Sequence, residues 1–304
     1  MNNTEKELLS KVIPDINYEY AYNIRSNSKS VERKITNNVK IISKEDNKGI
    51  DIIVKDNTNF EYIYIPVLIT ESGLSDIVYN DFYIGKNSNV YIIAGCAIKN
   101  EGISRSEHNG IHRFFVEEGS NVHYMETHYA EGHKHSDKIL NPITEVYLKN
   151  NSSMDMKSIQ IKGVDKTKRV TKIVLEDNAK LEVTEKIMTD NDAKADTIFD
   201  VKLNGVNSSC NVVSRSFATG NSKQKFKSKV YGNNKCYAHV ECDAILKDGG
   251  KVVAIPEIIA NNVDANLIHE ASIGKIAGEQ LIKLMTLGLT EKEAEKEIIK
   301  GFLK

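Results

Sequence analysis

Apolar residues keep largely to alternate positions along the middle of the chain, with polar residues between them. The segments 181–187 (LEVTEKI) and 196–203 (DTIFDVKL) show this pattern. A period of two is typical of a β-strand that buries one of its faces. Asn residues gather between these runs, and Asn favours turns because it tolerates left-handed backbone. The pattern therefore predicts an all-β middle in which short strands are separated by tight turns.

The turns form a loose repeat of a turn residue, small or polar residues, and then an apolar anchor. The repeat occurs at Asn87–Val90, Gly119–Val122, Asn151–Met154, Asn178–Leu181, Asn207–Cys210 and Asn233–Cys236. The anchors are separated by 32, 32, 27, 29 and 26 residues, and Val252 and Leu267 follow at about half that step. Repeats of this length suggest stacked coils. Propeller and leucine-rich repeat signatures are missing, so we predict a β-helix (β-solenoid) or a closely related stack of two sheets.

The two ends of the chain differ from the middle. Thr4–Glu7 matches a capping box and predicts a short amphipathic helix, followed by irregular strands over 17–75. Apolar residues at helical spacing predict a helix over Ser272–Leu287, which Gly288 would end. A second capping box, Thr290–Glu293, predicts another helix. We thus expect three parts: 1–75, a β-helix core over 76–268, and a helical segment over 269–304.

Composition narrows the classes of function. The 304 residues contain 41 Lys and Arg against 42 Asp and Glu, for a net charge of -1, which disfavours nucleic-acid binding. The longest apolar-rich run, Tyr62 to Ile69, is far shorter than the roughly 20 residues of a membrane span. Four Cys do not make a disulfide framework in a chain of this size. We therefore expect free thiols and a cytoplasmic protein.

Six of the eight His residues lie in one stretch, 108–135, which invites a metal-binding interpretation. They are His108, His112, His123, His128, His133 and His135. A metal-dependent β-helix enzyme built on this stretch is therefore an alternative function, although no HExxH or CxxC motif supports it. Phosphate loops and G-x-G-x-x-G motifs are also missing, so we expect this chain to bind no nucleotide.

The four Cys residues differ in their surroundings. Cys210 and Cys236 occupy anchor positions and are expected in the core, and the same holds with less support for Cys96. Cys242 lies in 237–243 (YAHVECD), among ligand-type side chains, and His269-Glu270 follows it by about one repeat. Neighbouring coils could bring these two segments together. The alternative is that Cys242 is only packed and that His269-Glu270 caps a helix beginning near Ser272.

Several motifs resemble the SufB/SufD family of iron–sulfur cluster assembly proteins. The C-terminal signature consists of 267–276 (LIHEASIGKI), 279–281 (EQL), Met285, 288–289 (GL), 293–294 (EA) and 301–302 (GF). Further matching stretches are 78–82 (VYNDF), 110–114 (GIHRF), 213–216 (VSRS) and 241–243 (ECD). The match spans essentially the whole chain and is closest to the short, stand-alone members of the family.

The resemblance implies a right-handed parallel β-helix whose C-terminal helices dock the ABC-type ATPase SufC. It also implies that Cys242, His269 and Glu270 take part in assembling an iron–sulfur cluster, with sulfur from a donor such as a cysteine desulfurase system. Because all three residues coexist here, the chain is expected to pair with itself. The sulfur-accepting Cys stays open, and Cys96 is a weak candidate. We thus expect a scaffold and no enzyme of its own, the alternatives being the metal-dependent enzyme and a purely structural interaction protein.

Two details of this scaffold follow from local geometry. Adjacent residues of a strand point to opposite faces, so only one of His269 and Glu270 can share a face with Cys242 unless a second protomer contributes. A thiolate at Cys242 would also make this residue partly reactive before iron binds. The ATPase is expected to bind apolar residues near the tip of the helical segment, namely Leu281, Leu284, Met285 and Leu287.

Overall fold

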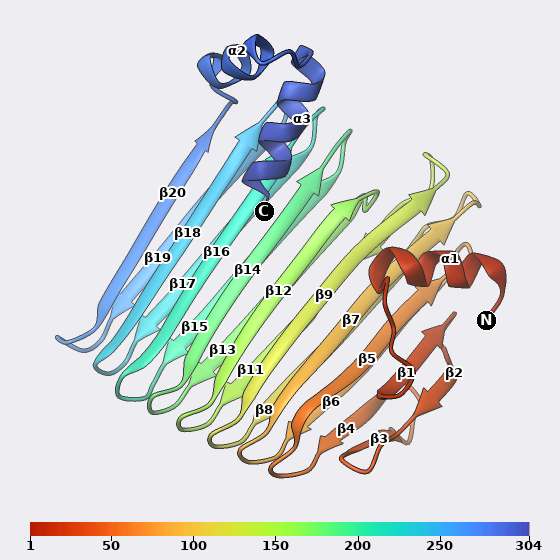
Figure 1. Ribbon diagram of the computed structural model, residues 1–304, viewed down its shortest axis with the longest axis vertical. Helices are drawn as coiled ribbons and strands as arrows, with labels where there is room; N and C mark the ends of the chain where they lie inside the picture. Colours follow the sequence, from red (N-terminus) through yellow and green to blue (C-terminus); the bar gives the residue numbers. More distant parts are fainter. Residues whose placement is uncertain (304) are drawn as a thin grey trace.

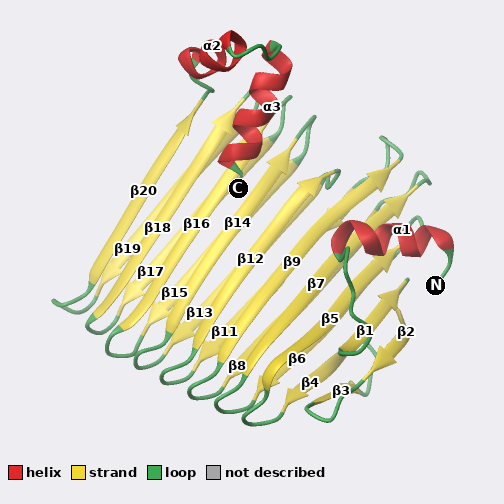
Figure 2. Cartoon of the chain, viewed as in Figure 1, coloured by secondary structure: helices red, strands yellow, loops and turns green. Residues whose placement is uncertain are grey.

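Two long β-sheets lie face to face and form a β-solenoid in the computed structural model, which describes residues 1–303 (Figure 1). Sheet A contains β1 (Ala21–Ser26), β2 (Lys29–Lys34), β5 (Asn59–Ile69), β7 (Asn89–Asn100), β9 (Asn121–Gly132), β12 (Ser153–Lys162), β14 (Lys180–Thr189), β16 (Ser208–Ala218), β18 (Cys236–Leu246) and β20 (Asn266–Gly274). Sheet B contains β3 (Val39–Ser43), β4 (Gly49–Val54), β6 (Ser75–Ile84), β8 (Ser106–Val116), β10 (Lys138–Leu140), β11 (Ile143–Leu148), β13 (Lys166–Leu175), β15 (Lys194–Leu203), β17 (Lys223–Gly232) and β19 (Lys251–Ala260). The prediction of a mainly β, solenoid fold is confirmed (Figure 2).

From β5 onwards the coils contribute to both sheets in turn, and equivalent strands pair in parallel with the coils before and after; β10 and β11 together fill one place in sheet B. The hairpins β1–β2 and β3–β4 at the N-terminal end pair antiparallel. The predicted row of anchors is confirmed over most of its length, because each anchor pairs with the next on the neighbouring strand. The paired anchors are, in order, Val90, Val122, Met154, Leu181 and Cys210. The prediction is wrong at the last step. Cys210 pairs with Ala238, and Cys236 pairs with Ser208, two residues away. The row then continues to Leu267, whereas Val252 belongs to sheet B.

The turns confirm the role assigned to Asn. The first residue of the repeat has a positive φ at Asn87, Asn151, Asn178 and Asn207, with values of 53°, 58°, 56° and 56°, and at Gly119, with 70°. A left-handed conformation costs roughly 1–2 kcal/mol for most L-residues, whereas Asn and Gly adopt it readily. These residues therefore fix where each strand begins and hold consecutive coils in register.

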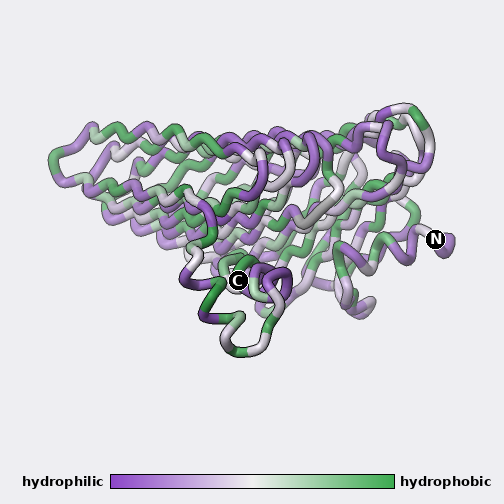
Figure 3. Tube along the Cα trace, turned by 90° about the horizontal axis from the view of Figure 1, so that it is seen from above, coloured by the Kyte–Doolittle hydropathy of each residue, from purple (hydrophilic) through white to green (hydrophobic). Residues whose placement is uncertain are grey.

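The apolar core fills one side of the space between the sheets. It includes the anchor row of sheet A and facing residues of sheet B such as Phe82 and Phe114, whose rings stack 4.3 Å apart. Figure 3 shows the two sheets as layers in which hydrophobic and hydrophilic residues alternate along the chain. The alternation lets each strand bury one face while the other stays polar.

Helix α1 (Asn3–Val12) packs on the outer face of sheet A, near the N-terminal end of the solenoid. Leu8, Leu9 and Val12 are buried there, and Gly95 of β7 makes the close approach possible. The predicted helix exists, but its cap differs. Asn2 is the N-cap and Glu5 completes the capping box, two residues before the predicted Thr4–Glu7 box.

Helices α2 (Gly278–Thr286) and α3 (Glu291–Phe302) follow β20 and lie on the same side of the solenoid as α1 (Figures 1 and 3). The capping box at Thr290 is confirmed, and so is the helix end before Gly288, whose φ is 97°. The predicted start at Ser272 is wrong, because Ser272–Gly274 pair with β18 and extend β20. Strand pairing overrides the helical spacing there. Among residues 1–303, no helix has the length and apolar character that a bilayer span requires.

Candidate functional site

The other side of the solenoid interior is lined by buried polar and charged side chains. Strands of sheet A carry them in their second half and strands of sheet B in their first half, so they meet where sheet A turns into sheet B. The set includes Arg25, Asp76, His108, His112, Glu126, His128, Arg169, Glu185 and Ser214, each no more than 8% exposed. Charged groups are costly to bury unless they are paired. This buried polar row is therefore built from ion pairs and hydrogen bonds.

The row begins with Asp76, which lies between a guanidinium and an imidazole. Arg25 donates to Asp76 at 3.1 Å, and the Nδ1 atom of His108 lies 3.0 Å from the other carboxylate oxygen. Burial works to raise the pKa of Asp76, but the hydrogen bond and charge of His108 outweigh it and lower the pKa. His112 lies on the same strand as His108, and its Nδ1 atom contacts the Tyr124 hydroxyl at 2.8 Å. Burial lowers the pKa of His112 to about 4, so this imidazole stays neutral at physiological pH.

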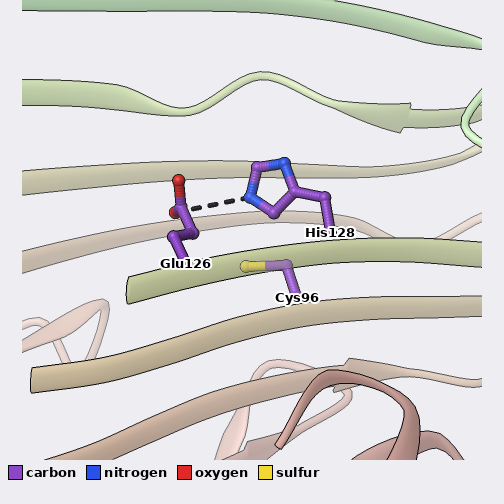
Figure 4. Close-up of side chains that lie close together, drawn as sticks. All are labelled: Cys96, Glu126 and His128. Carbon is purple, nitrogen blue, oxygen red and sulfur yellow. Dashed lines mark ion pairs between the residues drawn. The ribbon is translucent and has the colours of Figure 1, made fainter. Parts of the chain in front are cut away.

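Cys96, Glu126 and His128 form the next group, and each offers one potential ligand atom within 4.8 Å of the others (Figure 4). Arg169 already occupies a central place beside them. Its guanidinium donates to Glu126 at 2.6 Å and lies 3.1 Å from Nδ1 of His128. Burial raises the pKa of the Cys96 thiol well above its ordinary value, so Cys96 is not a thiolate here. In this structure, Arg169 is therefore the cation beside Cys96, Glu126 and His128.

The row continues from Arg169 to Glu185. The guanidinium lies 3.6 Å from this carboxylate, which also accepts hydrogen bonds from Ser214 at 2.8 Å and Thr197 at 3.1 Å. Burial raises the pKa of Glu185, in contrast to Glu126. Cys242 pairs with Ser214 on the neighbouring strand and lines the same small space as Glu185. Cys242 thus stands where the buried polar row reaches the C-terminal end of the solenoid.

The three residues singled out as a cluster site are brought to the last two strands of sheet A, but not to one face. Cys242 is buried, and burial raises its pKa to about 12. His269 pairs with the inward residue Val240, so it shares the interior face with Cys242, offset by two residues on the adjacent strand. Strand spacing and rise place their Cα atoms about 8 Å apart. Glu270 pairs with Glu241 on the outer face, where its carboxylate lies 3.6 Å from His239.

His269 carries an unused ligand atom. Burial lowers its pKa, and its Nε2 atom is buried without a hydrogen-bond partner among residues 1–303. A neutral imidazole with a free nitrogen is a good ligand for iron. Cys242 is buried in this conformation, and its raised pKa favours the protonated thiol. The partial reactivity that thiolate ligation implies for the iron-free state stays a prediction. The Cys242 thiol must lose its proton when it binds iron.

The solenoid ends openly after β19 and β20. Among the described strands, each of these two has a neighbour on one side only, and inward residues such as Leu267 are only partly buried. Exposed apolar residues of the two strands are Val253, Ile258, Ile268 and Ile273. Unpaired strand edges with exposed apolar residues are sites of pairing with another chain.

The helical segment presents part of its apolar surface to solvent. Met285 and Leu287 are 43% and 75% exposed, whereas Leu281 and Leu284 are half-buried. Ile282, which is 63% exposed, was not among the residues predicted for this surface. In contrast, α3 rests on sheet A, where Arg215 donates to the Phe302 carbonyl at 3.3 Å.

The structure separates the His-rich stretch into two groups. His108, His112 and His128 are buried in the polar row, whereas His123 points outward, and His133 and His135 lie in an exposed loop. The sequence analysis missed Glu126, Arg169 and Glu185. The available signal was parity: Glu185 stands at an inward position of the alternating run 181–187.

Comparisons with known proteins agree with this architecture. A family model described as "SUF system FeS cluster assembly, SufBD core domain" matches residues 69–302. The chain belongs to the SufBD family. It is 30% identical over 259 residues to an iron–sulfur cluster assembly SufBD family protein of Methanocaldococcus jannaschii, covering 83% of this chain and 79% of the relative.

Two further SufBD family proteins give a consistent result. One from Pyrococcus horikoshii is 30% identical over 272 residues, with 87% of this chain and 81% of the relative covered. One from Methanothermobacter thermautotrophicus is 26% identical over 241 residues, covering 78% of this chain and 57% of the relative. The function of the chain therefore lies in iron–sulfur cluster assembly, as the resemblance implied.

Proposed function

We propose that this SufBD family protein is the scaffold on which a nascent iron–sulfur cluster is built, at the open C-terminal end of the solenoid. The observation that carries this proposal is the placement of Cys242 and His269 on one interior face of the last two strands of sheet A. Iron and sulfide are the cargo, and a donor such as a cysteine desulfurase system would supply the sulfur. The site would be in the cytoplasm.

The ligand set suits a cluster that has to be released. A thiolate from Cys242 holds iron strongly, and an imidazole from His269 is a weaker ligand. The free Nε2 of His269 supports this role, because a buried nitrogen without a partner is otherwise unfavourable. Glu270 lies on the outer face and would reach the cluster only from a second protomer or after a rearrangement of β20.

A second copy of the chain is proposed to cover the open end. The edges of β19 and β20 and their exposed apolar residues offer strand pairing and apolar burial together. A two-fold arrangement would bring two Cys242–His269 pairs near one another. Light scattering at micromolar concentration would show a dimer, and Ile268→Lys on β20 would shift it towards the monomer. A wild-type monomer, with and without the ATPase, would refute this part.

The partner ATPase, of the SufC type, is proposed to bind the α2–α3 segment. Ile282, Met285 and Leu287 expose apolar side chains that the fold itself leaves without cover. The half-buried Leu281 and Leu284 would shape that surface from below. ATP hydrolysis would take place in the partner and not in this chain.

The experiment that tests the cluster site is anaerobic reconstitution with ferrous iron and sulfide, followed by measurement of bound iron, bound sulfide and visible absorbance. Cys242→Ala should abolish the cluster and His269→Ala should lower its yield. Cys210→Ala is the matched control, because Cys210 is an equally buried thiol in the apolar core. Full cluster occupancy in Cys242→Ala, with an unchanged circular dichroism spectrum, would refute the assignment.

The same measurement separates the scaffold from a metal-dependent enzyme built on the His-rich stretch. His112→Asn replaces a neutral imidazole in the buried polar row far from Cys242. The scaffold proposal expects normal cluster yield from this variant, provided that it remains folded. Loss of cluster in His112→Asn together with normal yield in Cys242→Ala would favour the metal-dependent enzyme. If the wild-type chain takes up no cluster, the scaffold proposal fails and a purely structural interaction protein is the remaining alternative.

A further inference from the structure

A cavity of about 380 Å³ lies at the N-terminal end of the solenoid, opposite the end that carries Cys242. It is enclosed by the β1–β2 hairpin, by the region of β3 and β4, and by neighbouring residues of β5 and β6. Volumes of 300–1,000 Å³ are typical of sites for small molecules. We call this cavity the N-terminal pocket; its lining includes Arg25, Lys29, Arg33, Ile65 and Val67.

The lining of the N-terminal pocket is cationic. It contains Arg25, Lys29 and Arg33, several hydroxyl and amide groups, and not one carboxylate among the residues that line it. Within the described chain, Lys29 and Arg33 form no ion pair. Arg33 donates only to neutral acceptors: Asn23 Oδ1 at 2.8 Å, Ser43 Oγ at 3.0 Å and the Ile41 carbonyl at 3.5 Å. Two positive charges at this pocket therefore have no carboxylate partner among the described residues, and both can be reached by solvent, since Lys29 is exposed and Arg33 is half-buried.

Arg25 adds a buried donor without a partner. It is 8% exposed, and its two terminal nitrogens donate to Asp76 at 3.1 Å and to the Asn47 carbonyl at 3.5 Å. Its Nε–H has no partner in the part of the chain that the structure describes. Its one carboxylate partner, Asp76, also binds His108 at 3.0 Å. Arg25 thus shares its one carboxylate partner with His108.

These arginines also have a structural role, because Arg25 and Arg33 both connect the β1–β2 hairpin of sheet A to β3 and its following turn in sheet B. That role accounts for their hydrogen bonds. It does not account for Lys29, for the lack of any acid in the lining, or for the space left between the hairpins. Burial lowers the pKa of Arg33, because part of its guanidinium is removed from water.

We propose that the N-terminal pocket binds a small anionic ligand that carries a phosphate or carboxylate group. Guanidinium groups recognise both through paired, charge-assisted hydrogen bonds, and the surrounding hydroxyl and amide groups can bind further oxygens. The apolar residues at one side, such as Ile65 and Val67, fit a short organic body attached to the anionic group. This site is independent of the cluster site, which lies at the other end of the solenoid.

The test is calorimetric titration of the full chain with inorganic phosphate and, separately, with succinate, in buffers whose ionic strength is held constant with sodium chloride. We expect saturable binding of one anion per chain for at least one of the two probes. Saturation by phosphate alone assigns a phosphate-bearing ligand, and saturation by succinate alone assigns a carboxylate-bearing one. No saturable binding of either would overturn the proposal.

Two variants and a control connect such binding to the pocket. Arg33→Gln should weaken binding about tenfold or more, the scale of a lost charge-assisted contact, and Lys29→Gln by a smaller factor. Lys40→Gln changes an exposed lysine of β3 outside the lining and should bind like the wild type. Lys29 is exposed, so Lys29→Gln keeps the test valid even if Arg33→Gln unfolds. The proposal would be overturned if the Lys29→Gln and Arg33→Gln variants both remained folded and both bound the anion with wild-type affinity.

Discussion

Replacing Arg169 with Leu would remove the single cation at the centre of the buried polar row. Arg169 is 4% exposed and lies 2.6 Å from Glu126, 3.1 Å from His128 and 3.6 Å from Glu185. Leu fills part of the space but leaves two buried carboxylates facing an apolar group. The variant therefore tests whether the row depends on paired charge or only on packing.

The expected decrease in the free energy of unfolding comes from carboxylates that stay buried without a cation. The lost attraction within the ion pair contributes less. Removing one partner of a buried pair costs about 3–5 kcal/mol, because the remaining charge is desolvated without compensation. Most of this cost should come from Glu126. Burial alone would raise its pKa, but His128 and Arg169 hold the pKa well below its ordinary value. Burial lowers the pKa of His128, so the permanently charged Arg169 is the lasting partner.

The pH dependence follows from the direction of these shifts. A carboxyl whose pKa is lowered in the folded state stabilises the protein above its unfolded pKa of about 4.3, and this contribution is lost as the pH falls. In Arg169→Leu the pKa of Glu126 should rise, so that Glu126 takes up a proton more easily in the folded state. The stability gap between variant and wild type should therefore be largest near pH 7 and shrink towards pH 4.5.

Urea unfolding followed by circular dichroism at both pH values measures this gap. The double variant Arg169→Leu/Glu126→Gln is the matched control, because it also removes the buried charge of Glu126. It should regain at least about half of the free energy of unfolding that Arg169→Leu loses. Glu185→Gln alone should cost little, since burial raises the pKa of Glu185 in the wild type. An unchanged midpoint for Arg169→Leu at pH 7, or a double variant no more stable than the single one, would refute the reasoning.

Four further outcomes are expected. Gly95→Val should undock α1 and lower the thermal midpoint by several degrees, because even a Cβ at Gly95 would lie 2.7 Å from Val12; an unchanged midpoint would contradict this. Asn151→Ala should cost about 1 kcal/mol in urea unfolding and Asn151→Gly almost nothing, since φ is 58° at this turn. Leu287→Asp should weaken binding of a SufC-type ATPase by about 2 kcal/mol in a calorimetric titration, and equal affinity would exclude Leu287 from the interface. His112, with a folded pKa of about 4, should reduce stability as the pH falls from about 6.5 to 4, and this slope should diminish in His112→Asn.

The sequence by itself determined the repeating features of this protein, because each depends on residues close together in the chain. Alternation predicted strands, Asn at turns predicted where coils begin, and the Thr290–Glu293 box predicted a helix start. These signals act within a few residues, where backbone geometry and local hydrogen bonds decide the outcome. The family resemblance likewise rested on short motifs that can be read directly.

Only the tertiary structure decided which side chains meet inside the solenoid. Arg169 lies 43 residues after Glu126, and their contact depends on the exact length of every coil between them. A shift of one residue would turn each inward side chain to the solvent, and a two-residue difference already moved Cys236 out of the predicted row. The same dependence placed His269 with Cys242 and turned Glu270 away. Tertiary pairing also decided that residues 272–274 form a strand. These residues pair with β18, and a helix that began there would lose the backbone hydrogen bonds of this pairing.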